Sequence, residues 1–135
     1  MYDKELKIAV KAAYSAGKAI MKLYKKKYEI NYKSPNDPVT QADMESEKIV
    51  LKALKKSKHG MLSEESLENK KRLKKETIWI VDPIDGTKDF IDKTGEFAIS
   101  IGLAEKGEPV LGVLYAPAID IMYYAVKGEG AYAGK

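Results

Sequence analysis

The chain has 135 residues, of which 24 are basic, 20 are acidic and 44% are hydrophobic, with a formal net charge of +4. This length suits one domain, and the composition is typical of a globular protein rather than a disordered one. There is no cysteine and only one histidine, His59, so disulfides and thiolate metal sites are excluded and any metal must be held by oxygen ligands.

The sequence shows no sign of a membrane or nucleic-acid partner. It contains no apolar run of about 18 residues or more, and its N-terminus, "MYDKELK", lacks the apolar segment of a signal peptide. We therefore expect a cytoplasmic protein. The lysine-rich stretch at Lys70–Lys75 is short and has no interleaved aromatic residue, which favours a solvated loop over a site for a nucleic-acid polymer. His59 is expected to be exposed at a helix end.

Two amphipathic helices are predicted in the first half of the chain. From Asp3 to about Lys26, apolar residues such as Leu6 and Ile20 recur with helical spacing and form one buried stripe. The segment "KSPNDPVT" then breaks the pattern with two prolines. A second helix is expected from about Thr40 to Lys56.

Strands are predicted after Gly60. Two helices followed by a run of strands indicate an α+β fold, with two long N-terminal helices packed on one face of an antiparallel β-sheet. The expected strands are read from the stretches "MLSEES", "TIWIV", "GEFAISIGLAE", "PVLGVLYAP" and "AIDIMYYAV", and "KGEGAYAGK" supplies a final turn with room for a short last strand.

The stretch "WIVDPIDGTKDF" places two carboxylates, Asp82 and Asp85, directly after a buried strand. A strand that reaches Asp-Pro is expected to stop its ladder, so we expect a turn at the sheet's edge. Two carboxylates that converge in such a turn repel each other unless a cation lies between them. All-oxygen ligation suits Mg²⁺, and the Ile84 carbonyl between the two aspartates can face the same point.

The next residues, Gly86 and Thr87, are predicted to begin a short helical turn. The free N–H groups of such a turn suit a phosphate oxygen, and a cation beside them makes a phosphate-handling arrangement. The alternative interpretation is a turn in which an aspartate caps a short helix.

Two further carboxylate motifs occur earlier in the chain. The stretch "SEES" carries Glu64 and Glu65, and "DPVTQAD" ends in Asp43. Thr40 and Asp43 also match a capping box that opens the second helix, so this motif alone favours a structural role. Three such motifs on one small domain favour the metal and phosphate interpretation.

The motifs "DPVTQAD", "SEES" and "WIVDPIDGTKDF", in this order and spacing, resemble the inositol monophosphatase superfamily of Mg²⁺-dependent, lithium-sensitive phosphomonoesterases. The resemblance runs from about Tyr14 to the last residue. Within the superfamily, "GTKDF" and the later "GEFAISIGLAEKGEPVLGVLYAPAIDIMYYAVKGEGAY" most resemble the 3'(2'),5'-bisphosphate nucleotidases of the CysQ type. The resemblance implies the first half of the layered αβαβα sugar-phosphatase fold.

The resemblance also implies a set of metal ligands. Glu64, Asp82 and the Ile84 carbonyl would bind a first Mg²⁺, and Asp82 and Asp85 a second. The complete enzyme would hold two or three such ions, for which Mn²⁺ or Ca²⁺ can substitute.

The catalytic roles implied by the resemblance fall on neighbouring residues. Thr87, with its hydroxyl oriented by Asp43, would activate the water that attacks phosphorus, and Glu65 would support the same hydrogen-bond network. The amides of Gly86 and Thr87 would bind the substrate phosphate. Asp43 can serve in this way and cap its helix as well.

Full-length members of the superfamily carry a second α/β half with a "WDxAA" motif, whereas the one tryptophan of this chain is Trp79. We therefore expect residues 1–135 to form one domain, the metal-binding N-terminal half, with the second half absent and with weak or no activity alone. The small phosphorylated substrate would be adenosine 3',5'-bisphosphate, with inositol monophosphate and fructose 1,6-bisphosphate as alternatives. The other hypothesis is a non-catalytic truncated relative that binds divalent metal and self-associates. In either case we expect a homo-oligomer.

Overall fold

The computed structural model describes residues 2–24, 30–34, 37–63 and 76–134. Two helices precede most of the strands, as the sequence predicts. In chain order the elements are α1 (Asp3–Tyr24), β1 (Ile30–Ser34), β2 (Asp37–Thr40), α2 (Gln41–Leu54), the 3-10 helix η1 (Lys55–Ser57), β3 (Gly60–Ser63), β4 (Thr77–Asp85), α3 (Thr87–Ile91), β5 (Ala98–Glu105), β6 (Glu108–Ala116), β7 (Ile121–Val126) and β8 (Ala131–Gly134).

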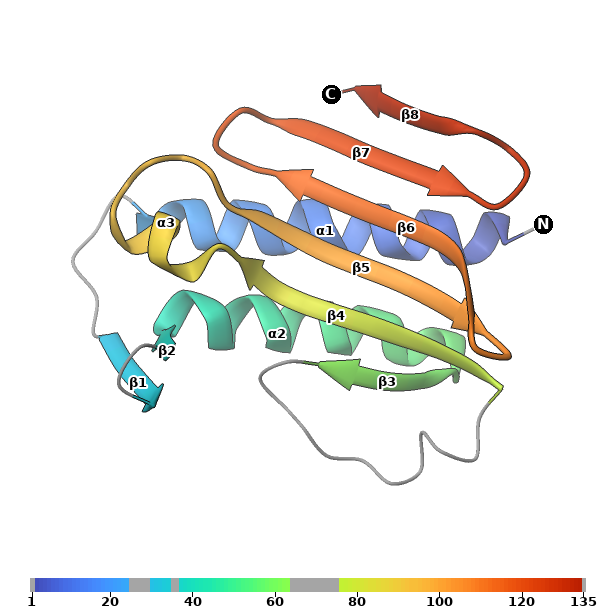
Figure 1. Cartoon of the computed structure of the whole chain (residues 1–135), viewed down its shortest axis with the longest axis horizontal. Helices are drawn as coiled ribbons and strands as arrows, with labels where there is room; N and C mark the ends of the chain where they lie inside the picture. Colours follow the sequence, from blue (N-terminus) through green and yellow to red (C-terminus); the bar gives the residue numbers. More distant parts are fainter. Residues whose placement is uncertain (1, 25–29, 35–36, 64–75, 135) are drawn as a thin grey trace.

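Six strands form one sheet in the order β3-β4-β5-β6-β7-β8, and α1 and α2 lie side by side across one face of it (Figure 1). This arrangement confirms the predicted α+β class. The sheet is mixed rather than wholly antiparallel, because β3 pairs with β4 in parallel while the other neighbours pair antiparallel. The chain between Ser63 and Thr77 is long enough for the crossover that a parallel pair requires.

The predicted end of the first helix, near Lys26, lies outside the described residues, whereas the segment before the second helix contains strands that the sequence does not predict. Residues around the two prolines were predicted only to break the helical pattern, but Ile30–Ser34 and Asp37–Thr40 pair as a small antiparallel sheet. The second helix ends at Leu54, where the chain tightens into η1. Among the described residues, no helix combines the length and the apolar character needed to cross a membrane.

His59 is not the exposed residue that the sequence predicts. Its side chain is half-buried, and its Nε2 atom lies 3.1 Å from Oε2 of Glu5 in α1. Nearby, the indole N–H of Trp79 donates to Ser57 Oγ at 2.7 Å. Burial raises the pKa of Glu5, but the hydrogen bond with His59, a backbone hydrogen bond and neighbouring positive charge outweigh it, so the pKa of Glu5 is lowered overall. His59 therefore ties the start of α1 to the region before β3.

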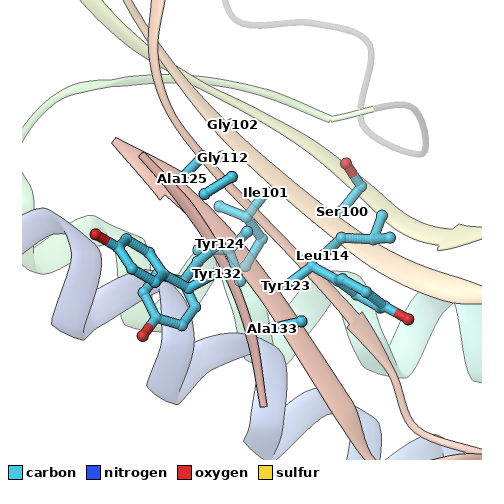
Figure 2. A pocket seen from close by; sticks show the side chains of 12 residues that line it. Ser100, Ile101, Gly102, Gly112, Leu114, Tyr123, Tyr124, Ala125, Tyr132 and Ala133 are labelled. Carbon is cyan, nitrogen blue, oxygen red and sulfur yellow. The ribbon is translucent and has the colours of Figure 1, made fainter. Parts of the chain in front are cut away.

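Among the described residues no helix lies on the other face of the sheet, which is called the open face below (Figure 1). Its cross-strand rows are Ile80–Gly102–Gly112–Ala125–Ala131 and Asp82–Ser100–Leu114–Tyr123–Ala133. Ile80, Leu114 and Tyr123 are 49%, 36% and 39% exposed. The small residues leave a depression of about 530 Å³ between the larger side chains (Figure 2). The open face is thus apolar and hollowed.

Helix α1 approaches the sheet closely at Gly17. A Cβ atom at this position would lie 2.4 Å from Cε2 of the Tyr115 ring in β6. The ring has little freedom to move, because its hydroxyl donates to Oδ1 of Asp120 at 2.7 Å. Burial and this hydrogen bond to a carboxylate raise the pKa of Tyr115, so the hydroxyl remains a donor. Glycine is needed here for close packing.

We expect Gly17→Ala to lower the free energy of unfolding by about 1–3 kcal/mol, because the added methyl group overpacks the contact with Tyr115. Helix propensity alone predicts the opposite, a gain of about 1 kcal/mol. The matched control is Ser15→Ala, at an exposed position of the same helix, which should change stability little. Urea denaturation measures both variants, and a Gly17→Ala protein as stable as the wild type would contradict the packing argument.

Candidate metal and phosphate site

The two aspartates of the central motif lie on a bulge inside β4. Asp82 pairs with Ser100 and Asp85 pairs with Ala98, so β4 has one more residue than β5 across this interval. Residues three positions apart in a regular strand point to opposite faces. The partners of the two aspartates, Ser100 and Ala98, are two positions apart in β5 and so lie on one face. The extra residue in β4 lets Asp82 and Asp85 stay opposite these partners. Asp82 and Asp85 are therefore brought to the same side of the sheet.

The prediction that the strand stops at Asp-Pro is wrong. β4 continues through Asp85 and pairs with β5 as far as that residue, whereas its pairing with β3 ends at Val81. A bulge leaves a residue out of the ladder, so Pro83 can occupy it although proline has no N–H to donate. Pro83 and Ile84 are both buried, which fits the break in alternation.

Helix α2 holds the bulge from the helix-covered side. The Ser46 hydroxyl donates a hydrogen bond of 2.7 Å to the carbonyl oxygen of Pro83, and the Ser46 side chain is fully buried. No sequence motif marks Ser46 as a site residue. Its signal is a buried polar position one helical turn after Asp43, on the same face of α2.

Asp43 and Thr87 lie in direct contact. The Thr87 hydroxyl donates to Oδ1 of Asp43 at 2.9 Å, and it also lies 3.3 Å from the Ile84 carbonyl oxygen. Asp43 is 1% exposed and occupies the first turn of α2, where the predicted capping box would place it. The Thr40 side chain lies outside the described part, so the capping box stays a prediction. A carbonyl oxygen has two lone pairs, so the Ile84 carbonyl can serve as a metal ligand in this position.

Gly86 forms the turn between the bulge and α3. Its φ of 94° is a left-handed conformation, and a Cβ atom would lie 2.9 Å from the Glu96 carbonyl oxygen. Only glycine fits this turn without strain. Phe90 anchors the short helix that follows. Its amide donates to the Gly86 carbonyl oxygen at 2.9 Å, and its buried ring packs against the Phe97 ring with 5.0 Å between the ring centroids.

The donors gathered at the bulge fit a hard divalent cation. They are the half-buried Asp82 carboxylate, the exposed Asp85 carboxylate and the Ile84 carbonyl, all oxygen ligands of the kind that Mg²⁺ prefers. In residues 2–24, 30–34, 37–63 and 76–134, no three His, Asp or Glu side chains form a metal-binding group. Glu64 and Glu65 lie outside the described residues, so their predicted roles stay predictions.

Comparison with known proteins agrees with this fold. The sequence profile of the inositol monophosphatase family matches residues 1–135. The 3'(2'),5'-bisphosphate nucleotidase CysQ of Salmonella typhimurium is 43% identical over 122 residues, which cover 87% of this chain and 50% of that protein. The crystal structure of CysQ from Bacteroides thetaiotaomicron, a bacterial member of the inositol monophosphatase family, superposes with a TM-score of 0.86 at 35% identity, covering all of this chain and 50% of that one.

A second solved structure shows the same relationship. The extragenic suppressor protein suhB from Bartonella henselae gives a TM-score of 0.90 at 34% identity, over 98% of this chain and 53% of that chain. The layers, the mixed sheet and the carboxylate bulge thus define a member of a sugar-phosphatase-like α+β class. The chain belongs to the inositol monophosphatase family and is CysQ-like. It spans about half the length of the curated relatives that it matches.

Proposed function

We propose that this chain is the metal- and phosphate-binding part of a Mg²⁺-dependent phosphomonoesterase that acts on a small phosphorylated substrate. The observation that carries the proposal is the Thr87 hydroxyl, held 2.9 Å from the buried Asp43 carboxylate and next to the Asp82–Asp85 bulge. A threonine hydroxyl fixed in this way beside two carboxylates can orient a water molecule by accepting its hydrogen bond.

The residues that would hold Mg²⁺ are Asp82, Asp85, the Ile84 carbonyl and Glu64. When bound, Mg²⁺ offsets the negative charge of the phosphate and lowers the pKa of water. Mn²⁺ or Ca²⁺ can substitute in an all-oxygen site of this kind.

The chain's own residues perform the remaining steps. Thr87 Oγ1 gives its hydrogen to Asp43, so its lone pairs are directed away from Asp43 and can accept a hydrogen bond from the attacking water. This contact orients the water in line with the phosphorus. The amides of Gly86 and Thr87 donate to the phosphate oxygens, as in the first turn of any helix. Glu65 supports the network around the water.

The similarity to CysQ proteins favours a nucleoside 3',5'-bisphosphate, and specifically adenosine 3',5'-bisphosphate, as substrate. Inositol monophosphate and fructose 1,6-bisphosphate remain the alternatives. We further propose that residues 1–135 act as the N-terminal half of such an enzyme, and that groups needed for full activity belong to the other half of the relatives' length. On this proposal the chain alone has weak activity or none. A cytoplasmic location stays a prediction.

We expect Mg²⁺ to raise the thermal midpoint of the chain, because a ligand that binds only the folded state stabilises it, by about 1.4 kcal/mol at ten times the dissociation constant. Asp82→Asn should remove this response, since it removes a charged ligand. Asp92→Asn, the same change at an exposed aspartate just beyond α3, is the control and should keep the response. Thermal unfolding at increasing Mg²⁺ measures all three proteins, and a wild-type midpoint that does not move would remove the basis for the metal site.

Phosphate release from adenosine 3',5'-bisphosphate tests the activity. We expect a low rate for the chain alone in Mg²⁺ and a higher rate when the C-terminal half of a CysQ relative is added. Thr87→Val should then lower the rate by about 100-fold or more, as expected when the group that orients the water is lost. Thr77→Val, at the far end of β4, is the control. No release with the added half would contradict the phosphatase proposal, and an enzyme-like rate without it would contradict the proposed dependence on a second half.

The open face favours the alternative function, self-association, as a second candidate for the isolated chain. Ile80, Leu114 and Tyr123 together expose an apolar surface of the kind that mediates contacts between chains. We therefore propose that the chain forms a homodimer or larger oligomer through the open face.

We expect sedimentation velocity at micromolar concentration to show an oligomer, and Leu114→Lys or Tyr123→Lys to shift it towards monomer because a charge on this surface opposes burial. Ile119→Lys is the matched control: Ile119 is 55% exposed but lies in the turn between β6 and β7. A wild-type chain that sediments as a monomer would rule out this association, and equal effects of all three lysine variants would place the interface elsewhere.

A further inference from the structure

Ser46 makes an unusual contact for a serine inside a helix. A buried helical serine commonly donates to the backbone carbonyl one turn earlier in its own helix. Ser46 instead donates across the gap between α2 and β4 to the Pro83 carbonyl, at 2.7 Å, and both residues are less than 2% exposed. The contact joins two elements at the residue that occupies the bulge.

The contact fixes the part of the backbone on which the site is built. A peptide unit is planar and rigid, so a hydrogen bond to the Pro83 oxygen restrains the whole unit between Pro83 and Ile84. Asp82 is the residue directly before this peptide unit, and Asp85 is the residue directly after it. The directions of both carboxylates therefore depend on it, as does the direction of the Ile84 carbonyl.

The same helix also holds the segment beyond the bulge. Asp43, one turn before Ser46, accepts the Thr87 hydroxyl at 2.9 Å. Two side chains on one face of α2 thus hold Pro83 and Thr87, on either side of Asp85. A bulge interrupts the regular ladder, so these contacts restrain a segment that cross-strand pairing leaves less constrained.

We propose that Ser46 is a positioning residue for the metal site: by holding the Pro83 carbonyl it keeps Asp82, Asp85 and the Ile84 carbonyl converged on one cation. This inference rests on the proposed function, since it assumes that the bulge binds Mg²⁺. A hydrogen bond that only stabilised the fold would change the free energy of unfolding and leave metal affinity unaltered. The two roles therefore differ in a measurable quantity.

The test is the dissociation constant for Mg²⁺, measured by equilibrium titration at a temperature where every variant is folded by circular dichroism. We expect Ser46→Ala to weaken Mg²⁺ binding by about 10-fold or more, the range found when groups that orient metal ligands are lost. Ser46→Cys keeps the volume with a weaker donor and should give an intermediate loss. If Ser46→Ala does not fold, Ser46→Cys alone decides the inference.

Ser57→Ala is the matched control. Ser57 Oγ accepts the Trp79 indole N–H at 2.7 Å, so its removal also deletes a side-chain hydrogen bond that joins the helix layer to β4, but away from the bulge. We expect this variant to lose stability and to bind Mg²⁺ within about twofold of the wild type. A Ser46 variant that is folded and binds Mg²⁺ as the wild type does would overturn this inference but leave the proposed metal site standing. A wild-type chain that does not bind Mg²⁺ would overturn the proposed metal site and this inference with it.

Discussion

The extra residue in β4 is the constraint on which the candidate site depends. Without it, Asp82 and Asp85 would point to opposite faces of the sheet, because side chains alternate along a strand. The register to Ser100 and Ala98 shows that the bulge removes this conflict. Proline is suited to the inserted position, since it lacks the N–H that a regular ladder would need. The motif Asp-Pro-Ile-Asp is thus a way to place two carboxylates on one side of a buried strand.

A bulge alone does not fix where its carboxylates point, and α2 supplies that restraint. Asp43 and Ser46 are buried almost completely, and burying polar groups is costly unless they are hydrogen-bonded. Both find partners in the segment from Pro83 to Thr87. The packing of α2 against the sheet and the shape of the site are therefore coupled, because separating them would leave buried polar atoms without these bonds.

Much of this architecture was predictable from the sequence, and the errors have identifiable causes. Helical periodicity gave α1 and α2, and alternating apolar residues gave the antiparallel strands. Asp-Pro normally ends a strand, whereas a bulge can absorb a proline, so the extension of β4 to Asp85 is not evident from the sequence. The parallel pairing of β3 with β4 and the contact of His59 with Glu5 depend on residues far apart in sequence, which local patterns do not reveal.

The site residues also divide into those marked by a local motif and those placed by contacts between distant parts of the chain. Asp82, Asp85 and Gly86 were recognisable because a short motif holds them together, and the contact of Thr87 with Asp43 followed from the family resemblance. Ser46 has no motif, because its role comes from a tertiary contact 37 residues away along the chain. Its burial on the face of α2 that carries Asp43 is the only local sign.

The open face and the candidate site are continuous with each other. The cross-strand row that begins at Asp82 runs through Ser100 to Leu114 and Tyr123, so the candidate metal-binding end of the row and its apolar end lie on one surface. Whatever polypeptide covers Leu114 and Tyr123 is thereby brought along the same row towards Asp82. On the proposed function, burial of the apolar surface and completion of the metal site are then two consequences of one contact. On the proposed function, this continuity is the physical reason to expect that a polypeptide covering the apolar end of the row also adds groups near Asp82.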